Sequence, residues 1–129
     1  MVVDASVVVD LLAGTTYATA ARARLTGTVM HAPAHMDAEV LSALGRLQRA
    51  GELATVDVEA GLATLAAVPV TRHPVVDLVA GAWSRRHDLR LTDALYVELA
   101  TRLRVPVLTT DQRMARASAV AEGISVHTR

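Results

Sequence analysis

The chain has 129 residues, enough for one domain with a substantial hydrophobic core, and we expect a single domain over residues 1–129. The formal net charge is zero, which disfavours a nucleic-acid binder that works through bulk positive charge, and the absence of cysteine excludes disulfides and thiolate metal sites. No apolar run approaches the roughly 18 residues of a membrane span, and no signal-peptide pattern is present, so we expect a cytoplasmic protein with no membrane contact.

Short valine-rich runs alternate with longer stretches rich in alanine and leucine, a pattern typical of a parallel α/β domain. The pattern predicts five strands, over residues 1–4, 28–33, 68–72, 105–110 and 123–128. It also predicts seven helices, over residues 6–13, 17–26, 34–50, 55–67, 73–88, 92–104 and 111–121. Pro74 is expected in the first turn of the fifth helix, and Thr92 is expected to cap the sixth.

The composition also limits the kind of core and the kind of basic surface. Phe is absent and Trp and Tyr are rare, so the core is expected to consist of Val, Leu and Ala. All thirteen basic residues are arginines, whose planar guanidinium groups can bind phosphate through two hydrogen bonds.

Two aspartates occupy equivalent places in the predicted sheet. Asp4 follows the first valine pair, and Asp111 follows the run VPVLTT, so each ends a strand and precedes a helix. Parallel sheets bind ligands outside the carboxyl ends of their strands, so we expect both carboxylates to face one cleft. Asp93 lies in the first turn of a predicted helix, where the helix dipole alone would explain an acidic residue.

The helix predicted over residues 34–50 carries two further candidates, Asp37 and Glu39. Its apolar stripe consists of Met36, Val40, Leu44 and Leu47. The two acids flank this stripe on opposite sides, so the helical periodicity does not choose between them.

Several carboxylates in one cleft require compensation for their charge. Two unit charges about 4 Å apart repel by roughly 4 kcal/mol at an effective dielectric constant near 20. Such a cluster must take up protons or bind cations, and an all-oxygen donor set favours Mg²⁺ or Mn²⁺ over zinc. These ions bind phosphates and activate water, so the pattern indicates metal-assisted chemistry at phosphorus.

Four segments together resemble a PIN domain, and their order and the chain length are most similar to the VapC toxins of bacterial toxin–antitoxin pairs. The segments are VVDAS, AEVLSAL, LTDALYVELA and VLTTDQRM, and the resemblance extends from residue 1 to about residue 127. It implies that the catalytic and metal-binding acids are Asp4, Glu39, Asp93 and Asp111. It therefore selects Glu39 over Asp37. Ser6 matches a small polar residue that follows the first acid, either as a carboxylate partner or as a helix cap.

The same resemblance implies a fold and an activity. PIN domains are three-layer α/β/α sandwiches around a central parallel sheet, here expected to have five strands. VapC proteins are metal-dependent endoribonucleases, so we expect RNA as the substrate and Mg²⁺ or Mn²⁺ as the cofactor. The expected partners are a cognate VapB-type antitoxin and a second copy of the chain, in a homodimer that forms a heterotetramer or larger assembly with the antitoxin.

Other polar and aromatic residues have plainer interpretations. Asp10 is expected to be a solvated position or a local ion-pair partner. His35 lies four residues before Glu39 and could border the cleft, but a surface position is the favoured interpretation. Trp83 and Tyr96 are interpreted as packing residues, with base stacking by Tyr96 as the less favoured alternative.

Two other functions fit parts of the pattern. An inactive PIN-fold module that acts only by binding its antitoxin would not need four intact acids. A phosphatase of the haloacid dehalogenase type also has an aspartate after its first strand, but it requires a second aspartate two residues later, where this chain has Ser6. The endoribonuclease interpretation is therefore preferred.

Overall fold

A five-stranded parallel sheet organises the part of the chain that the computed structural model describes, residues 1–124. The strands are β1 (Val2–Val3), β2 (Met30–Pro33), β3 (Val70–His73), β4 (Val107–Thr109) and β5 (Ala121–Gly123). Their order across the sheet is β3-β2-β1-β4-β5, and every neighbouring pair is parallel. The first strand of the chain is therefore the central strand of the sheet.

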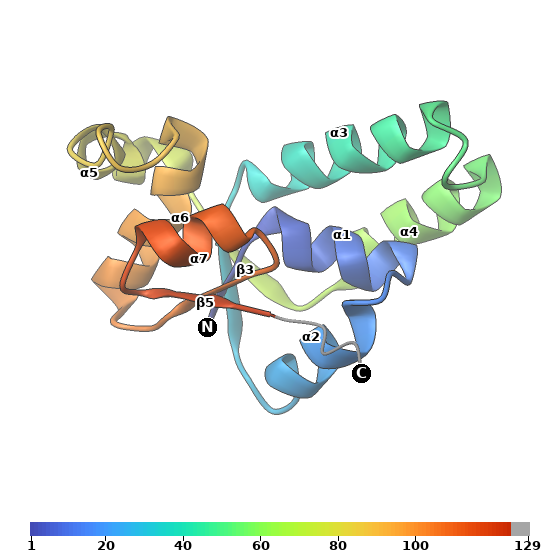
Figure 1. Ribbon diagram of the computed structural model, residues 1–129, viewed down its shortest axis with the longest axis horizontal. Coiled ribbons are helices and arrows are strands. Elements are labelled where there is room, and N and C mark those ends of the chain that lie inside the picture. Colours follow the sequence, from blue (N-terminus) through green and yellow to red (C-terminus); the bar gives the residue numbers. More distant parts are fainter. Residues whose placement is uncertain (125–129) are drawn as a thin grey trace.

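Helices connect the strands and cover both faces of the sheet (Figure 1). They are α1 (Ala5–Ala13), α2 (Ala18–Leu25), α3 (Met36–Arg49), α4 (Thr55–Ala67), the 3-10 helix η1 (Val75–Leu78), α5 (Val79–Trp83), α6 (Leu91–Leu103) and α7 (Gln112–Ala117). Helices α1 to α4 gather on one side of the sheet, and α5 and α6 lie on the other (Figure 1). The predicted three-layer α/β/α sandwich is thus confirmed. None of the described helices combines the length and the apolarity needed to cross a bilayer.

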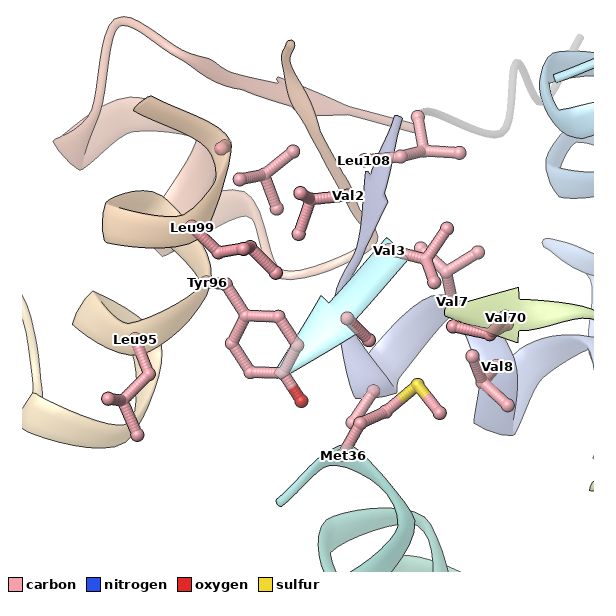
Figure 2. Close-up of a cluster of buried hydrophobic side chains, with 14 of the residues drawn as sticks. Val2, Val3, Val7, Val8, Met36, Val70, Leu95, Tyr96, Leu99 and Leu108 are labelled. Atoms are coloured by element: carbon pink, nitrogen blue, oxygen red, sulfur yellow. The ribbon is translucent and has the colours of Figure 1, made fainter. Parts of the chain in front are cut away.

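The core forms where the central strands meet the helices on both faces (Figure 2). Val2, Val3 and Leu108 are fully buried, as expected for central strands covered on both sides. Tyr96 of α6 is the largest fully buried side chain, and Met36 of α3 is also fully buried. The core is therefore mainly aliphatic, as the composition predicts, with one buried aromatic ring that becomes important below.

The apolar stripe predicted for α3 forms the contact of this helix with α1 and α4. Met36, Val40 and Leu44 are fully buried, and Leu47 is partly buried. The stripe fixes the rotation of α3 about its axis, and with it the directions of the acidic side chains between the apolar positions.

The helix predicted over residues 73–88 is wrong in its extent. Pro74 precedes the short helix η1, and α5 ends at Trp83, where the backbone changes to turns in which the N–H groups of Arg85 and Arg86 bond to carbonyls three residues earlier. Side chains add two further bonds to carbonyls of this segment. Ser84 Oγ donates to the carbonyl of Gly81 at 2.6 Å, and Arg86 Nη1 donates to the carbonyl of Trp83 at 3.0 Å. Trp83 is also 58% exposed, with the Arg86 guanidinium 4.6 Å from its ring centroid, so its interpretation as a packing residue is wrong.

Two other predicted boundaries move. Helix α6 begins at Leu91, so Thr92 lies inside its first turn and the N-cap residue is Arg90. The last helix ends at Ala117 instead of Ala121, because pairing with β4 requires an extended chain over β5. The remainder of the predicted strand, residues 125–128, lies outside the described residues.

Burial predicts different costs for two leucines of α3. We expect Leu44→Ala to lower the free energy of unfolding by about 2–5 kcal/mol, because Leu44 is fully buried and its truncation leaves a cavity. The matched control is Leu41→Ala, since Leu41 is 56% exposed on the same helix and should change stability by less than about 0.5 kcal/mol. Urea unfolding followed by circular dichroism measures both, and equal losses would contradict the described rotation of α3.

Candidate functional site

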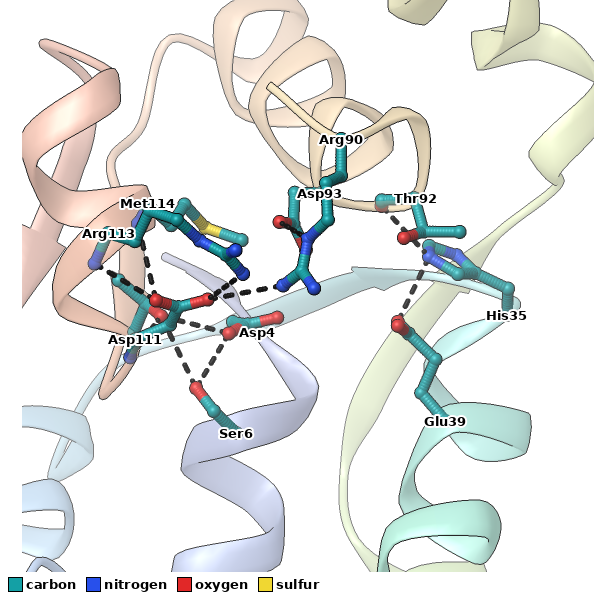
Figure 3. A network of polar contacts seen from close by, with 11 residues as sticks. Asp4, Ser6, His35, Glu39, Arg90, Thr92, Asp93, Asp111, Arg113 and Met114 are labelled. Carbon is teal, nitrogen blue, oxygen red and sulfur yellow. Dashed lines mark hydrogen bonds and ion pairs between the residues drawn. The ribbon is translucent and has the colours of Figure 1, made fainter. Parts of the chain in front are cut away.

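A cleft of about 330 Å³ opens at the carboxyl ends of β1 and β4, and we call it the acidic cleft. It is lined by Asp4, Ala5, Ser6, Val9, Asp10, Glu39, Ala43, Arg46, Arg90, Asp93, Thr110 and Asp111. The structure therefore brings together all five residues singled out from the sequence, although they come from the start of α1, from α3 and from the starts of α6 and α7 (Figure 3). Their roles in chemistry are a separate question.

Asp4 lies at the N-cap position of α1, but its carboxylate does not cap the helix. Its Oδ2 atom accepts hydrogen bonds from Ser6 Oγ at 2.6 Å and from Thr109 Oγ1 at 2.9 Å. Ser6 in turn accepts a hydrogen bond from the backbone N–H of Thr110 at 3.1 Å. Of the two roles considered for Ser6, the helix cap is wrong, and the partner of the Asp4 carboxylate is the one found.

The surroundings of Asp4 favour its protonated form. Burial raises the pKa of Asp4 to about 6, against the opposing effect of the hydrogen bonds from Ser6 and Thr109. The negative charges of Asp93 and Glu39 raise the pKa further. Only 6% of the residue is exposed, so water screens these interactions weakly. The carboxylates of the cleft are therefore electrostatically coupled.

Glu39 is held by two donors that both reach its Oε1 atom. Tyr96 donates its hydroxyl at 2.6 Å, and His35 Nε2 lies 3.1 Å away. The same His35 nitrogen lies 3.2 Å from the carbonyl oxygen of Thr92, and two acceptors around one nitrogen require that it carries a hydrogen. Burial would raise the pKa of Glu39, but these hydrogen bonds and the charge of Arg90 outweigh it and hold the pKa below its usual value.

The other acid of α3, Asp37, points away from the cleft. Arg72 of β3 donates its Nε to Asp37 Oδ2 at 2.7 Å and its Nη2 to Asp37 Oδ1 at 3.0 Å. This two-bond pair ties α3 to the edge strand of the sheet. Geometry thus separates two residues that the helical periodicity left equivalent, with Glu39 in the cleft and Asp37 in a structural ion pair.

Asp93 and Asp111 share an arginine. Arg90 Nε donates to Asp93 Oδ2 at 3.1 Å, and Arg90 Nη2 lies 3.6 Å from Asp111 Oδ2 (Figure 3). Asp111 also caps α7, because its Oδ1 accepts from the backbone N–H of Arg113 at 2.9 Å. Asp93 is 8% exposed, and its single ion pair is the one with Arg90 among the residues described.

Asp10 lies at the rim of the acidic cleft, one turn and a half along α1 from Asp4. It accepts hydrogen bonds from Thr15 Oγ1 at 2.8 Å and from Thr110 Oγ1 at 2.7 Å. These bonds fasten the end of α1 and the turn after β4 to one another. Asp10 is therefore a structural acceptor, which differs from both the solvated position and the ion-pair partner expected for it.

The donor chemistry of the cleft fits a hard divalent cation, because its potential ligands are carboxylate and hydroxyl oxygens. The pKa of Asp4 is raised mainly by its burial, and further by the negative charges of Asp93 and Glu39. No three acidic or histidine side chains within residues 1–124 converge closely enough to form a ready-made ligand cage. The guanidinium of Arg90 lies between Asp93 and Asp111.

Tyr96 is fully buried, which confirms its interpretation as a packing residue and excludes base stacking, but its hydrogen bond to Glu39 has no signal in the sequence. Nothing in the sequence marks Thr109 or Arg90 individually as a site residue. His35 contacts Glu39, a lining residue of the cleft, so the less favoured of its two interpretations is the one found. The spacing of His35 and Glu39, four residues apart on one helix, was the one signal available for this contact.

Comparisons with known proteins show the family of the chain and support the fold. The PIN domain family model matches residues 1–120. The chain is 62% identical over 125 residues to Ribonuclease VapC3 of Mycobacterium tuberculosis. This alignment covers 96% of this chain and 91% of the relative. It is 42% identical over 118 residues to Ribonuclease VapC1 of the same organism, covering 90% and 89%. The crystal structure of PAE2754 from Pyrobaculum aerophilum shares the fold, with a TM-score of 0.68, 21% identity, and coverage of 93% of this chain and 80% of that one.

The raised pKa of Asp4 predicts a pH-dependent stability. Native Asp4 keeps its proton to a higher pH than unfolded Asp4, so its contribution to the free energy of unfolding falls as pH rises from about 4 to about 6. The loss is on the order of 3 kcal/mol. Asp4→Asn cannot ionise, so its free energy of unfolding should rise relative to that of the parent by about 1–3 kcal/mol when the pH is raised from 4.5 to 7.5. Urea unfolding in EDTA measures this difference. Exposed Asp88→Asn should follow the parent, and a variant Asp4→Asn that also follows it would contradict the assignment.

The hydroxyl of Tyr96 is expected to contribute to stability through Glu39. Tyr96→Phe removes the donor 2.6 Å from the Glu39 carboxylate and should lower the free energy of unfolding by about 1–3 kcal/mol. Tyr17→Phe is the matched control, because the Tyr17 hydroxyl makes no hydrogen bond within the described part of the chain. Thermal unfolding of the two variants compares them directly, and an unchanged melting temperature for Tyr96→Phe would show that the bond contributes nothing.

Proposed function

The chain belongs to the PIN domain family and is a close homologue of VapC ribonucleases, and from that premise we propose that it is a toxin that cuts RNA with the help of Mg²⁺ or Mn²⁺. The observation that carries the proposal is the gathering of Asp4, Glu39, Asp93 and Asp111, from four separate segments, in one cleft of this fold. The mutual repulsion of these acids is destabilising, and a bound divalent cation would relieve it.

We assign the metal-binding role to Asp4, Glu39, Asp93 and Asp111. When bound, a divalent ion would neutralise these charges and supply the Lewis acid that activates water and polarises the scissile phosphate. The assignment rests on oxygen donors alone, since the cleft has no imidazole or thiolate among its lining residues.

The residues around the acids act by orientation. Ser6 and Thr109 both bind Oδ2 of Asp4, which leaves Oδ1 without a hydrogen bond among the residues described and directs it to the cleft. Tyr96 and His35 do the same for Glu39 by occupying Oε1. Each acid thus presents one defined oxygen, and a preorganised donor loses less entropy when it binds an ion or accepts a proton.

We propose that Asp4 helps to deprotonate the attacking water, because its Oδ1 atom accepts no hydrogen bond from the residues described and Asp4 lines the cleft. Ser6, whose hydroxyl is 2.6 Å from Oδ2, keeps the carboxylate in place while this happens.

Arginines at the rim are proposed to hold the RNA backbone. Arg46 and Arg90 line the cleft, and Arg113 is 60% exposed beside Asp111. Because the chain has no net charge, RNA binding depends on these local groups and not on a general positive field.

The proposed setting is the cytoplasm, where a VapB-type antitoxin would hold the nuclease inactive. The negative cleft provides a physical reason for such a partner to offer a positively charged side chain. We also propose that the chain forms a homodimer, which would become a heterotetramer or larger assembly with the antitoxin.

RNA cleavage by purified protein tests the proposal. We expect end-labelled RNA to be cut with Mg²⁺ or Mn²⁺ and to stay intact with EDTA. Glu39→Gln should reduce the cleavage rate by about 10²-fold or more, because it removes a charged ligand. Asp37→Asn, two residues away on the same helix but outside the cleft, should stay within a few-fold of the parent.

Cleavage that persists in EDTA would refute the metal requirement. Equal losses in Glu39→Gln and Asp37→Asn would refute the assignment of the site. RNA that stays intact under all conditions, with antitoxin binding retained, would favour the inactive PIN-fold module.

A further inference from the structure

We propose that Arg90 is a built-in counter-cation that occupies part of the metal site and must be displaced before a divalent ion binds. This inference rests on the proposed metal-dependent function and goes beyond it by naming a residue of this chain that sets the affinity for the ion. Arg90 would thereby limit metal binding in the free protein, without any partner.

Arg90 contacts two of the four acids to which the metal-binding role is assigned. Its Nε donates to Asp93 Oδ2 at 3.1 Å, and its Nη2 lies 3.6 Å from Asp111 Oδ2. The two acids come from α6 and α7, so one guanidinium spans the gap between two elements of the cleft wall (Figure 3). A metal ion bound by Asp93 and Asp111 would therefore compete with this guanidinium for the lone pairs of the two carboxylates.

The local chain gives no other reason for an arginine at this place. Arg90 is the N-cap residue of α6, where its side chain makes no capping hydrogen bond. An arginine there also faces the positive end of the helix dipole, which disfavours a cation. The favourable interaction of the side chain is therefore with the acids of the cleft.

The charge balance of the cleft explains what Arg90 does when no ion is bound. Five carboxylates and the arginines Arg46 and Arg90 line the cleft. Asp4 is unfavourably affected by the charges of Asp93 and Glu39. Arg90 supplies a positive charge that favours ionised Glu39. Its contacts with Asp93 and Asp111 also hold these two acids in place, at the cost of weaker binding of a competing cation.

The ion pairs of Arg90 are weak enough for a divalent ion to displace its side chain. Its side chain is 61% exposed, and exposed ion pairs of this kind contribute little energy. Displacement by a divalent ion therefore requires only rotation of a long side chain into solvent, with no change in the backbone.

Arg113 provides a matched control in the same cleft. Its Nη2 lies 3.6 Å from Asp111 Oδ2, the same distance as in Arg90, and its side chain is 60% exposed. It makes no contact with Asp93 among the described residues. Arg90→Gln and Arg113→Gln therefore each remove one positive charge at the same distance from Asp111 Oδ2. Only Arg90→Gln also removes a hydrogen bond to Asp93 among the residues described.

Titration of the full chain, purified free of any partner, with Mn²⁺ in a calorimeter tests the proposal without measuring activity. We expect Arg90→Gln to bind Mn²⁺ about 3–10-fold more tightly than the parent, as loss of one or two weak ion pairs implies. Arg113→Gln should change the affinity by less than about 2-fold. Arg90→Lys, which keeps the charge without the planar fork, should lie between Arg90→Gln and the parent.

The outcomes separate this inference from the function on which it rests. If the parent binds Mn²⁺ and Arg90→Gln binds it equally or more weakly, Arg90 is no competitor and the inference fails while the proposed function stands. Equal tightening in both glutamine variants would also overturn it, because the effect would then be one of net charge. If the parent binds no Mn²⁺ at millimolar concentration, the proposed metal chemistry and the inference fail together.

Discussion

The parallel pairing of β1 with β4 is the constraint from which the acidic cleft follows. Val3 is in register with Leu108, and the backbone N–H of Asp4 continues the ladder by donating to the carbonyl of Leu108 at 3.0 Å. Both strands then end, and each chain turns into a helix at the same edge of the sheet. Residues more than a hundred positions apart thereby meet at Asp4 and Thr109. A one-residue slip in this register would send Asp4 to the opposite face and leave Thr109 without its acceptor.

The acids of the cleft are tolerated because each has partners of its own. Asp4 has two hydroxyl donors, Glu39 has a phenol and an imidazole, and Asp111 caps a helix. Asp93 has the guanidinium of Arg90. The pKa of Asp4 is nevertheless raised, mainly by burial and further by the charges of Asp93 and Glu39, and a nearby cation would stabilise the ionised form of this acid. Stability and proposed function therefore make opposite demands on the same residues.

Sequence reasoning succeeded where function depends on position along the chain. Asp4 and Asp111 end short valine-rich strands, and the rule that ligands gather at the carboxyl ends of parallel strands was enough to bring them together. Glu39 required the resemblance to PIN domains, because helical periodicity leaves it equivalent to Asp37. The pairing of Asp37 with Arg72, which separates the two, depends on a strand thirty-five residues away.

The remaining site residues depend on side-chain contacts between distant elements, which a single sequence does not encode visibly. Thr109 and Tyr96 read as ordinary strand and helix residues, and their roles come from the acids that they happen to face. The helix boundaries near residues 84 and 117 were misplaced for a related reason. Local turn hydrogen bonds in one case and strand pairing in the other overrode a good helical composition.

The turns that follow β1 and β4 bring more than side chains to this edge of the sheet. Helix α1 begins directly after β1, and α6, which precedes β4 in the chain, also begins beside the cleft, so the partial positive charge at the N-termini of both helices lies near the carboxylates. An approaching phosphodiester therefore meets a potential that is less repulsive than the formal charges of the acids suggest. The side chains at this edge of the sheet thus attract a cation, and the backbone at the helix N-termini favours the approach of an anion.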